Sequence, residues 1–278
     1  MKDIVVIYHG HCHDGFSGAW VAWKKFGDRA EYIGIKFDDA SALVADREVY
    51  LIDFVYSEKI LEKLIASNKK VVVIDHHLSN QQRVEIVSEK LFDLKHSGAV
   101  LAWQYFFPQQ PIPKLLQYVE DSDLWIFKLP QSKEITLALD LFDLEFDVWD
   151  KLANDLEQKE SFQKIFEKGS IIMEHNNRLI KDLIKENADL VNFEGYQALV
   201  VNLPGTLDIH SALGHELSLK QPPLGIIWSE RHGQKVFSLR SDGTVDVSQI
   251  AQKYGGGGHK AAAGFSLLAD QPLPWKRV

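Results

Sequence analysis

Short apolar runs and amphipathic stretches alternate along the chain from residue 3 to about residue 78. The runs are rich in β-branched residues and lack polar alternation, a pattern typical of strands buried on both faces of a parallel sheet. The pattern predicts strands near 3–9, 30–35, 49–53 and 70–75 and helices near 16–26 and 57–67. Because strands and helices alternate along the chain, we predict an α/β fold with a doubly wound, mainly parallel sheet.

A helical region follows this alternation. Ser97 is a good N-cap for a helix through Phe107, and the prolines at 111 and 113 open a helix that reaches Asp121. Apolar residues at three- and four-residue spacings then predict a long helix from about 160 to 185.

Beyond Gly195 the alternation restarts and indicates a second domain. It predicts strands near 197–202, 224–229 and 235–240 and helices near 211–219 and 247–254. We therefore expect a first domain at 1–160, a helical linker at 161–190 and a smaller α/β domain at 191–278.

The composition is that of an ordinary globular protein, with 45% hydrophobic and 25% charged residues among 278. A single cysteine excludes an internal disulfide, and the sequence shows no secretory leader and no apolar run of about 18 residues. We expect a cytoplasmic protein without a membrane partner. The net charge of -8 argues against nonspecific binding to duplex DNA, but it is compatible with a small anionic substrate held through metal ions.

Acidic and imidazole side chains come directly after three of the predicted strands. The first strand leads into His9 and Asp14, the 49–53 strand ends on Asp53, and the 70–75 strand runs into His76 and His77. The carboxyl ends of parallel strands meet at the crevice where α/β proteins bind ligands, so we expect these side chains to converge.

Converging carboxylates need a compensating charge. Two of them repel each other by about 4 kcal/mol at roughly 4 Å in an effective dielectric near 20. Divalent ions remove this repulsion, since an aspartate can bridge two ions about 3.5–4 Å apart while histidine supplies a neutral nitrogen. The mixed set favours two Mn²⁺ ions over a thiolate-type zinc site, with Mg²⁺ and Co²⁺ as alternatives.

Five motifs in order resemble a known family. They are His9–Asp14, Asp53, Asp75-His76-His77, Asp121-Ser122-Asp123, and Gly255–His259 followed by Ala261–Phe265. Over nearly its full length the chain looks like a DHH superfamily phosphoesterase with a C-terminal DHH-associated (GGGH-type) substrate-binding domain. Members of this superfamily include single-strand exonucleases, nanoRNases and cyclic-dinucleotide phosphodiesterases.

The resemblance implies roles for individual residues. The implied metal ligands are His9, Asp14, Asp53, His76 and Asp121, with Cys12 and Asp123 as further candidates. His77 is expected beside the scissile phosphate rather than on metal, and Asp75 is expected to hold an imidazole in its metal-ligating tautomer. Asp121 is preferred to Asp123 because a hydroxyl residue follows it, as in many relatives.

The first motif departs from the common family pattern at Cys12, where an acid is usual. Either the thiolate or a neighbouring imidazole replaces that ligand, or the His9 position binds metal weakly and fills only with substrate. For His11 and His13 we expect outer-shell or solvent-facing positions. A zinc cluster of these adjacent residues is a poor alternative, because they cannot easily all reach one tetrahedral ion.

The glycine run of the second domain is expected to form an anion-binding turn. Exposed amides of Gly256, Gly257 and Gly258 would make a nest for an anion, with His259 as an added donor. Arg240 and Ser241, at a strand end, are the expected partners. Our hypothesis is that Arg240 and His259 bind the distant end of the substrate and thereby set its length.

Several other residues have a structural interpretation. Ser97-Gly98-Ala99 is expected to cap a helix and pack closely, with phosphate contact by its amides as the alternative. Trp20, Trp23 and Trp103 lie on predicted helices and are expected in the core. For Trp125, just after the fourth motif, packing is favoured over stacking on a base.

The sequence thus predicts a metal-dependent phosphoesterase that hydrolyses phosphodiester bonds of short single-stranded oligonucleotides or dinucleotides. The alternatives are a nucleotide phosphatase of the 3'-phosphoadenosine 5'-phosphate type and a non-catalytic nucleotide-binding module. The expected partner is the nucleotide or short nucleic-acid substrate, and a homodimer is compatible with the sequence.

Overall fold

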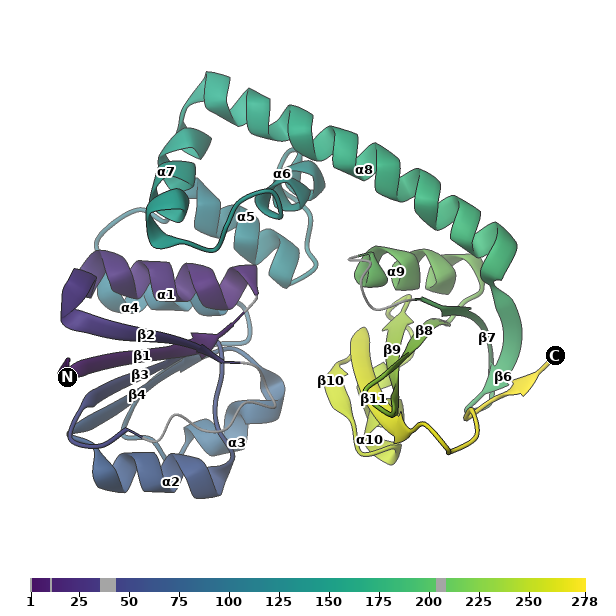
Figure 1. Cartoon of the computed structure of the whole chain (residues 1–278), viewed down its shortest axis with the longest axis horizontal. Coiled ribbons are helices and arrows are strands. Elements are labelled where there is room, and N and C mark those ends of the chain that lie inside the picture. The colour runs from purple at the N-terminus through teal and green to yellow at the C-terminus, as the bar shows by residue number, and fades with distance from the viewer. Residues whose placement is uncertain (1, 11, 36–43, 204–208) are drawn as a thin grey trace. The chain divides into compact units, whose positions relative to one another are not determined.

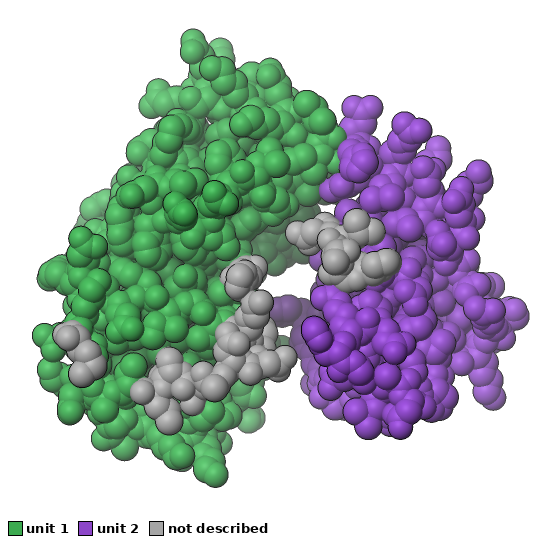
Figure 2. All heavy atoms as spheres, in the orientation of Figure 1, with its two compact units in different colours: residues 1–173 green, residues 174–278 purple. Residues whose placement is uncertain are grey.

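The chain divides into two compact units, residues 1–173 and 174–278 (Figure 2), which we call the N-terminal unit and the C-terminal unit. The computed structural model describes residues 2–10, 12–35, 44–203 and 209–278. Helix α8 (Lys159–Asn187) runs across the division between the units and takes up most of the expected linker. None of the helices in these described ranges is long and apolar enough to cross a membrane.

The N-terminal unit is built on a five-stranded sheet of order β2-β1-β3-β4-β5, in which every neighbouring pair is parallel. Its strands are β1 (Ile4–His9), β2 (Ala30–Ile35), β3 (Glu48–Ile52), β4 (Lys70–Asp75) and β5 (Glu89–Phe92). The first four occupy the predicted positions, and the doubly wound α/β class is confirmed.

Both faces of this sheet are buried, as the unbroken apolar runs predicted. Val6, Tyr50 and Val72 face one core, whereas Val5 and Leu51, at alternate positions, face the other. Helices α1 (His13–Phe26) and α4 (Gly98–Phe106) cover the first face, and α2 (Glu58–Ser67) and the short α3 (Gln81–Val84) cover the second (Figure 1).

Three further helices pack beyond α1 and α4. They are α5 (Lys114–Asp123), α6 (Ser132–Leu139) and α7 (Phe146–Glu157). The Trp149 indole of α7 donates a hydrogen bond of 2.9 Å to the Ser17 hydroxyl of α1, and both side chains are fully buried.

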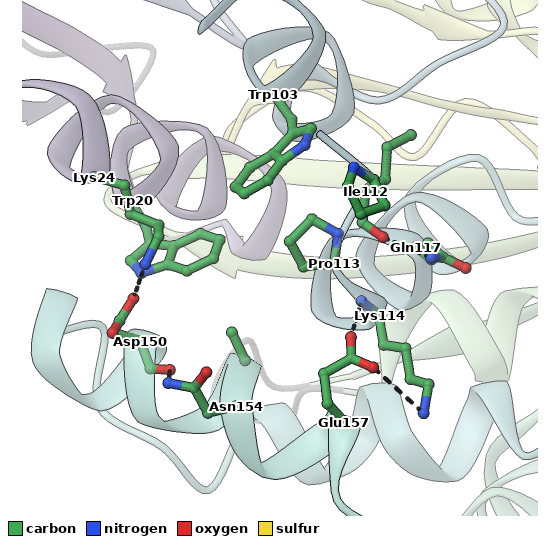
Figure 3. Close-up of a pocket in the computed structure, with 12 residues that line it drawn as sticks. Trp20, Lys24, Trp103, Ile112, Pro113, Lys114, Gln117, Asp150, Asn154 and Glu157 are labelled. Atoms are coloured by element: carbon green, nitrogen blue, oxygen red, sulfur yellow. Dashed lines mark hydrogen bonds and ion pairs between the residues drawn. The ribbon is translucent and has the colours of Figure 1, made fainter. Parts of the chain in front are cut away.

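A hollow of about 560 Å³ lies among α1, α4, α5 and α7 (Figure 3). Trp20 and Trp103 line it as a stacked pair. Its two lysines form ion pairs, Lys24 with Asp150 and Lys114 with Glu157. These pairs neutralise the lysines, so the hollow lacks the charge that a phosphate group requires.

The strand order places a topological switch point between β1 and β3. The chain leaves β1 through α1 toward β2 on one side, and β3 lies on the other side. In open α/β sheets the crevice at this point, outside the carboxyl ends of the strands, is where ligands bind. His9 ends β1 and Asp53 follows β3, so both lie at this crevice.

The C-terminal unit contains a seven-stranded mixed sheet of order β10-β11-β9-β8-β7-β6-β12. Its strands are β6 (Asp189–Phe193), β7 (Tyr196–Asn202), β8 (Leu224–Arg231), β9 (Gln234–Ser241), β10 (Gly257–His259), β11 (Ala262–Leu268) and β12 (Lys276–Arg277). Among the strand pairs that the structure describes in this unit, only β7 and β8 run parallel. Helix α9 (His210–Lys220) packs on one face and α10 (Val247–Lys253) on the other.

Candidate functional site

Asp53 lies at the centre of the predicted site and is almost fully buried, with 2% of its surface exposed. Its backbone has a φ of 58°, in the left-handed region, and its amide donates to the Ile74 carbonyl at 2.9 Å. Few residues other than glycine adopt this conformation, although aspartate tolerates it better than most. The turn therefore directs a carboxylate across the end of the sheet at some conformational cost.

Three groups of potential metal donors surround this carboxylate, and in each group the donor atoms lie within 4.8 Å of one another. The groups are His9 with Cys12 and Asp53, Asp53 with His76 and His77, and Asp14 with His76 and Asp123. Asp53 and His76 each belong to two of them, so they are placed to serve adjacent ions. The expected convergence of side chains from β1, β3 and β4 is therefore present.

His76 lies among three carboxylates. Its Nε2 is 3.2 Å from Asp53 Oδ1, 3.6 Å from Asp14 Oδ2 and 3.5 Å from Asp123 Oδ2. Burial lowers the pKa of His76, but the hydrogen bond to Asp53 and the charges of the other two acids outweigh it and raise the pKa to about 10. In the metal-free protein the imidazolium thus supplies the compensating positive charge.

The pKa values of the neighbouring carboxylates reflect their burial and their mutual repulsion. Burial and the negative charges of Asp53 and Asp123 raise the pKa of Asp14 well above its usual range. Burial and Asp53 raise the pKa of Asp123 to about 6. Burial also acts to raise the pKa of Asp53, but hydrogen bonds from His76 and His9 prevail and lower it. These carboxylates fit a hard divalent cation, which would relieve their repulsion.

Asp14 is held in place by the N-terminus of α4. Its Oδ2 accepts a hydrogen bond of 2.7 Å from the Gly98 amide, and its Oδ1 accepts one of 2.9 Å from the Ala99 amide. Ser97 caps the same helix, since its hydroxyl accepts from the Val100 amide. The favoured structural role of Ser97-Gly98-Ala99 is therefore observed, and these amides bind a site carboxylate.

Glycine is required at two positions of the site. A Cβ at Gly98 would lie 2.7 Å from Asp53 Cβ and 2.9 Å from Asp14 Oδ2. A Cβ at Gly15, in the first turn of α1, would lie 2.2 Å from the His9 carbonyl oxygen. Both glycines allow a helix to begin against the site carboxylates or the end of β1.

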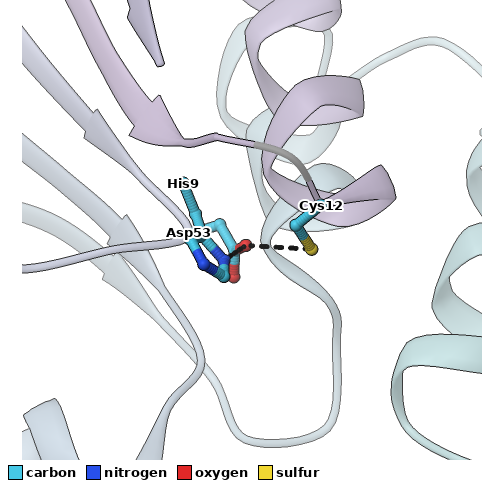
Figure 4. A group of neighbouring side chains, drawn as sticks. All are labelled: His9, Cys12 and Asp53. Atoms are coloured by element: carbon cyan, nitrogen blue, oxygen red, sulfur yellow. Dashed lines mark hydrogen bonds and ion pairs between the residues drawn. The ribbon is translucent and has the colours of Figure 1, made fainter. Parts of the chain in front are cut away.

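His9 and Cys12 both contact Asp53 Oδ2 (Figure 4). The His9 Nδ1 lies 3.3 Å from this oxygen and the Cys12 Sγ lies 4.0 Å from it. Burial and the nearby charges of Asp53 and Asp14 raise the pKa of the Cys12 thiol well above its usual range. The thiol is therefore neutral in the metal-free protein and would lose its proton on binding a metal.

His77 is oriented by Asp75. The His77 Nδ1 donates to Asp75 Oδ1 at 2.8 Å, and the other oxygen of this fully buried carboxylate accepts a hydrogen bond of 2.7 Å from the Asn80 amide group. Burial lowers the pKa of His77, but the Asp75 hydrogen bond and the charge of Asp53 raise it above its ordinary value. The hydrogen bond to Asp75 therefore fixes the orientation of the His77 ring at the edge of the donor groups.

The preference for Asp121 over Asp123 needs correction. Asp121 belongs to none of the three donor groups, whereas Asp123 belongs to one. The two carboxylate oxygens of Asp121 accept hydrogen bonds of 3.0 Å from the amides of Lys128 and Leu129. The carboxylate of Asp121 therefore holds a loop, and we assign Asp123 as the site residue of the fourth motif.

Of the two flanking histidines, His13 lies outside the donor groups. Its Nε2 is 3.3 Å from Asp140 Oδ1, and its ring lies against Trp149. This position agrees with the expectation that His13 is not a ligand. His11 lies outside the described residues.

In the C-terminal unit, Arg240 and His259 share one face of the sheet. Ala262 of β11 pairs with His259 on one side and with Arg240 on the other, and residues paired in this way point to the same face. The Arg240 Nη2 donates to the Ser211 hydroxyl of α9 at 2.9 Å. The small side chain of Ala262 therefore separates two basic groups whose Cα atoms are about 10 Å apart.

The other predicted contacts of this unit are revised. The Ser241 hydroxyl is buried and accepts hydrogen bonds from the amides of Gly243 and Val245, so it holds a turn. The amides of Gly255 and Gly256 donate to the carbonyls of Gln252 and Ala251 at the end of α10.

The glycine run packs closely at two of its positions. A Cβ at Gly256 would lie 2.1 Å from the Gly264 carbonyl oxygen, and one at Gly258 would lie 2.6 Å from that of Ala262. Gly257 and Gly258 belong to β10, the edge strand of the sheet. Close backbone contacts explain why positions 256 and 258 are glycine. Amides on the outer edge of β10 are the ones that could bind an anion.

Sequence reasoning missed the contacts of two supporting residues. Gly98 supplies an amide to Asp14 and leaves room for Asp53, and Asn80 fixes Asp75. The N-cap signal of Ser97 marked the start of α4, but nothing in the sequence indicated which side chain its amides would meet. Asn80 follows the third motif without any recognisable pattern.

Metal binding is expected to release protons at neutral pH. The pKa of about 10 for His76 means that this group is protonated at pH 7 in the metal-free protein and must lose its proton to become a ligand. Affinity for Mg²⁺ should therefore rise by about tenfold per pH unit as pH increases from about 6.5 to about 8. Calorimetry in buffers of different ionisation enthalpy measures the release, and its absence at pH 7 would contradict the proton on His76.

Replacing Cys12 with serine is expected to weaken one of two metal positions. A thiolate ligand prefers Co²⁺ or Zn²⁺ to Mg²⁺, so Cys12→Ser should lower Co²⁺ affinity by about tenfold or more and change Mg²⁺ affinity less. It should also abolish the near-ultraviolet sulfur-to-cobalt absorption of the Co²⁺ protein. Unchanged metal content, absorption and rate would remove Cys12 from the site.

Comparison with known proteins assigns the C-terminal part of the chain, because residues 206–272 match the DHHA1 domain family. The uncharacterized protein R106 of Acanthamoeba polyphaga mimivirus is 28% identical, over 99% of this chain and 70% of its own length. Oligoribonuclease NrnB of Bacillus subtilis (strain 168) is 26% identical, over 95% of this chain and 74% of its own length.

Solved structures share the fold at low identity. A DHH domain from a member of a ribosomal protein family has a TM-score of 0.62 at 13% identity, over 95% of this chain and 82% of its own. The pGpG-specific phosphodiesterase PggH of Vibrio cholerae has a TM-score of 0.55 at 14% identity, over 96% of this chain and 94% of its own. RecJ of Thermus thermophilus in complex with Mn²⁺ has a TM-score of 0.55 at 14% identity, over 95% of this chain and 49% of its own.

Proposed function

We propose that this chain, a DHH superfamily protein with a C-terminal DHHA1 domain by sequence and by fold, uses divalent metal ions to hydrolyse phosphodiester bonds in short oligonucleotides or dinucleotides. The resemblance that the five motifs predicted is confirmed by these comparisons. The activity and its substrate are our inference from the site.

One observation carries the proposal: the three donor groups at the switch point are linked through Asp53 and His76, each of which belongs to two of them. Surface acidic clusters are common without a metal, but Asp14, Asp53 and His76 are buried, and the His76 Nε2 lies 3.2 Å from Asp53 and 3.6 Å from Asp14. A fold that buries these charges without a cation must protonate them, as the raised pKa values of Asp14 and Asp123 indicate. The intact donor set also argues against a module that has lost its catalytic ligands.

Each group at the site has a part in the proposed reaction. Asp14, Asp53, Asp123, His9 and His76 would hold the ions, with Cys12 beside them. Divalent ions, when bound, would make a water molecule acidic enough to attack phosphorus and would neutralise the charge on the phosphate oxygens.

His77 supplies the remaining chemistry. Asp75 fixes its Nδ1 and favours the protonated ring, so Nε2 can donate a proton to a phosphate oxygen or to the leaving oxygen. No side-chain nucleophile is needed, and the thiol of Cys12 is held neutral by its surroundings.

The choice of substrate rests on the relatives and on Arg240. NrnB is named an oligoribonuclease and PggH a pGpG-specific phosphodiesterase, and RecJ was solved with Mn²⁺. Arg240 and His259 on a common face suit a second phosphate away from the scissile one. We therefore place short RNA and dinucleotides ahead of mononucleotides, and two Mn²⁺ ions ahead of Mg²⁺ or Co²⁺.

A substrate panel tests the proposal. Purified protein with Mn²⁺ is incubated with RNA and DNA oligomers of two to five nucleotides, linear and cyclic dinucleotides, and 3'-phosphoadenosine 5'-phosphate, and the products are separated by chromatography. We expect mononucleotides from the dinucleotides and short RNA, and little phosphate from 3'-phosphoadenosine 5'-phosphate. No product from any substrate would contradict the proposal, and fastest release from the mononucleotide would favour the phosphatase alternative.

Removing Arg240 is expected to raise KM for substrates that carry a terminal phosphate. Hydrogen bonds to charged groups contribute about 1.5–3 kcal/mol, so Arg240→Ala should raise KM about 10- to 150-fold with little change in kcat. The matched control is the same dinucleotide without its terminal phosphate, on which the variant should equal the wild type. An equal loss on both substrates would exclude this role of Arg240.

A further inference from the structure

The loop after α5 exposes two large apolar side chains. Trp125 is 44% exposed and Ile126 is 42% exposed, although both follow the fourth motif directly. This differs from Trp20 and Trp103, which are buried as expected. The packing expected for Trp125 therefore leaves a substantial part of its surface exposed.

Asp121 holds this loop in one conformation. Its carbonyl oxygen accepts hydrogen bonds from the amides of Ile126 at 2.8 Å and Phe127 at 3.1 Å. Its carboxylate accepts two more, at 3.0 Å each, from the amides of Lys128 and Leu129. A loop whose amides are bonded in this way to one buried residue is rigid, so the orientation of Trp125 is set before any ligand arrives.

The backbone of the loop is strained at both aromatic residues. Trp125 has a φ of 56° and Phe127 a φ of 49°, a left-handed conformation that is unfavourable for bulky side chains. The Phe127 ring supports the indole edge-on, with the two ring centroids 4.9 Å apart and the planes at 78°. Backbone strain of this kind is typical of functional sites.

Trp125 is also close to the metal donors. It lies two residues after Asp123, so the two Cα atoms are at most about 7.6 Å apart. The Asp123 carboxylate is 3.5 Å from His76 Nε2. The backbone of Trp125 therefore lies near the donor groups to which Asp123 and His76 belong.

We propose that Trp125 stacks on the base of the nucleotide next to the scissile phosphate. This inference rests on the proposed function and narrows it to substrates that carry a base. Stacking on an aromatic ring tolerates every base, because each presents a π face, so the contact selects nucleotides over base-free phosphodiesters without reading sequence.

Paired substrates test this contact. The first is a 5'-phosphorylated adenine dinucleotide, and the second is the same molecule with both bases replaced by hydrogen. Stacking of one base corresponds to a change of about 5- to 150-fold on alanine substitution. The wild type should prefer the base-containing substrate in kcat/KM by such a factor, and Trp125→Ala should lose this preference while it cleaves the base-free substrate normally.

Two further variants act as controls. Trp125→Phe should keep most of the preference, since phenylalanine retains a π face, and Ile126→Ala should keep all of it. An equal loss on both substrates by Trp125→Ala, or a preserved preference, would overturn the proposal and leave Trp125 as a structural residue.

A binding experiment distinguishes failure of the stacking proposal from failure of the proposed hydrolysis. Calorimetric binding of both ligands to the metal-free protein measures stacking without hydrolysis. The wild type should bind the base-containing ligand more tightly and Trp125→Ala should not. Absence of hydrolysis together with this binding difference would reject the enzymatic proposal alone, whereas equal binding by the wild type would reject the stacking contact.

Discussion

Asp53→Asn is expected to lower the rate of phosphodiester hydrolysis by about 1000-fold or more and to remove bound metal. Loss of an outer-shell partner typically costs about 10- to 100-fold in affinity or activity, and Asp53 is a shared member of two donor groups. Asparagine keeps the shape of the side chain and tolerates a positive φ, so the left-handed turn should survive. The losses would then arise from the missing negative charge.

The measurement pairs turnover with metal content determined by elemental analysis after dialysis. The matched control is Asp182→Asn, which removes an exposed carboxylate on α8 far along the chain from the motifs. This control should keep both activity and metal. Retention of full activity by Asp53→Asn would end the proposal of a metal centre at the switch point.

The two acids of the fourth motif are expected to respond in opposite ways. Asp123→Asn should lower kcat/KM by about 100- to 1000-fold, as expected for a metal ligand. The raised pKa of Asp123 shows that its charge is disfavoured in the metal-free protein. The variant should therefore unfold at the same temperature as the wild type or at a higher one when metal is absent.

Asp121→Asn should instead destabilise the protein. One asparagine oxygen cannot replace the two carboxylate oxygens that accept from Lys128 and Leu129, so a buried amide loses its partner. We expect a loss of about 1–3 kcal/mol in the free energy of unfolding and a smaller loss of activity. Thermal unfolding of both metal-free variants checks the contrast, and a reversed pattern would restore Asp121 as the ligand.

There is a physical reason why the sequence pattern does not distinguish the roles of Asp121 and Asp123. The sequence predicts a helix that reaches Asp121, whereas α5 continues to Asp123. Positions two apart on a helix point in nearly opposite directions, since each residue turns the chain by about 100°. A spacing of two residues therefore separates a ligand from a loop anchor, and only the packing of α5 decides which is which.

Strongly apolar elements were predictable, and weakly apolar ones were not. Strands β1 and β4 are continuous β-branched runs and were predicted within a residue. Strand β5, Glu89–Phe92, carries two charged residues in four and forms because β4 offers its free edge. Its stability comes from tertiary pairing, which local periodicity does not encode.

The candidate site likewise has features that the sequence predicted and features that it did not. The convergence of side chains at the strand ends followed from the sequence, because the end of a parallel strand determines where its next side chain emerges. The support of Asp14 by α4 depends on residues 84 positions away. The glycine run has the composition of either an anion nest or a tightly packed segment, and its close approach to the backbone of Gly264 depends on a strand that is distant in the pattern.

The two hydrogen bonds from the N-terminus of α4 to Asp14 also affect the cation selectivity of the site. Each oxygen of this carboxylate already accepts a backbone amide, so one lone pair per oxygen remains and symmetric bidentate chelation is disfavoured. Calcium favours six to eight oxygen ligands and often a bidentate carboxylate, whereas smaller ions accept octahedral geometry with single contacts. These two hydrogen bonds should therefore make the site bind Ca²⁺ weakly even where the concentration of Ca²⁺ exceeds that of Mn²⁺.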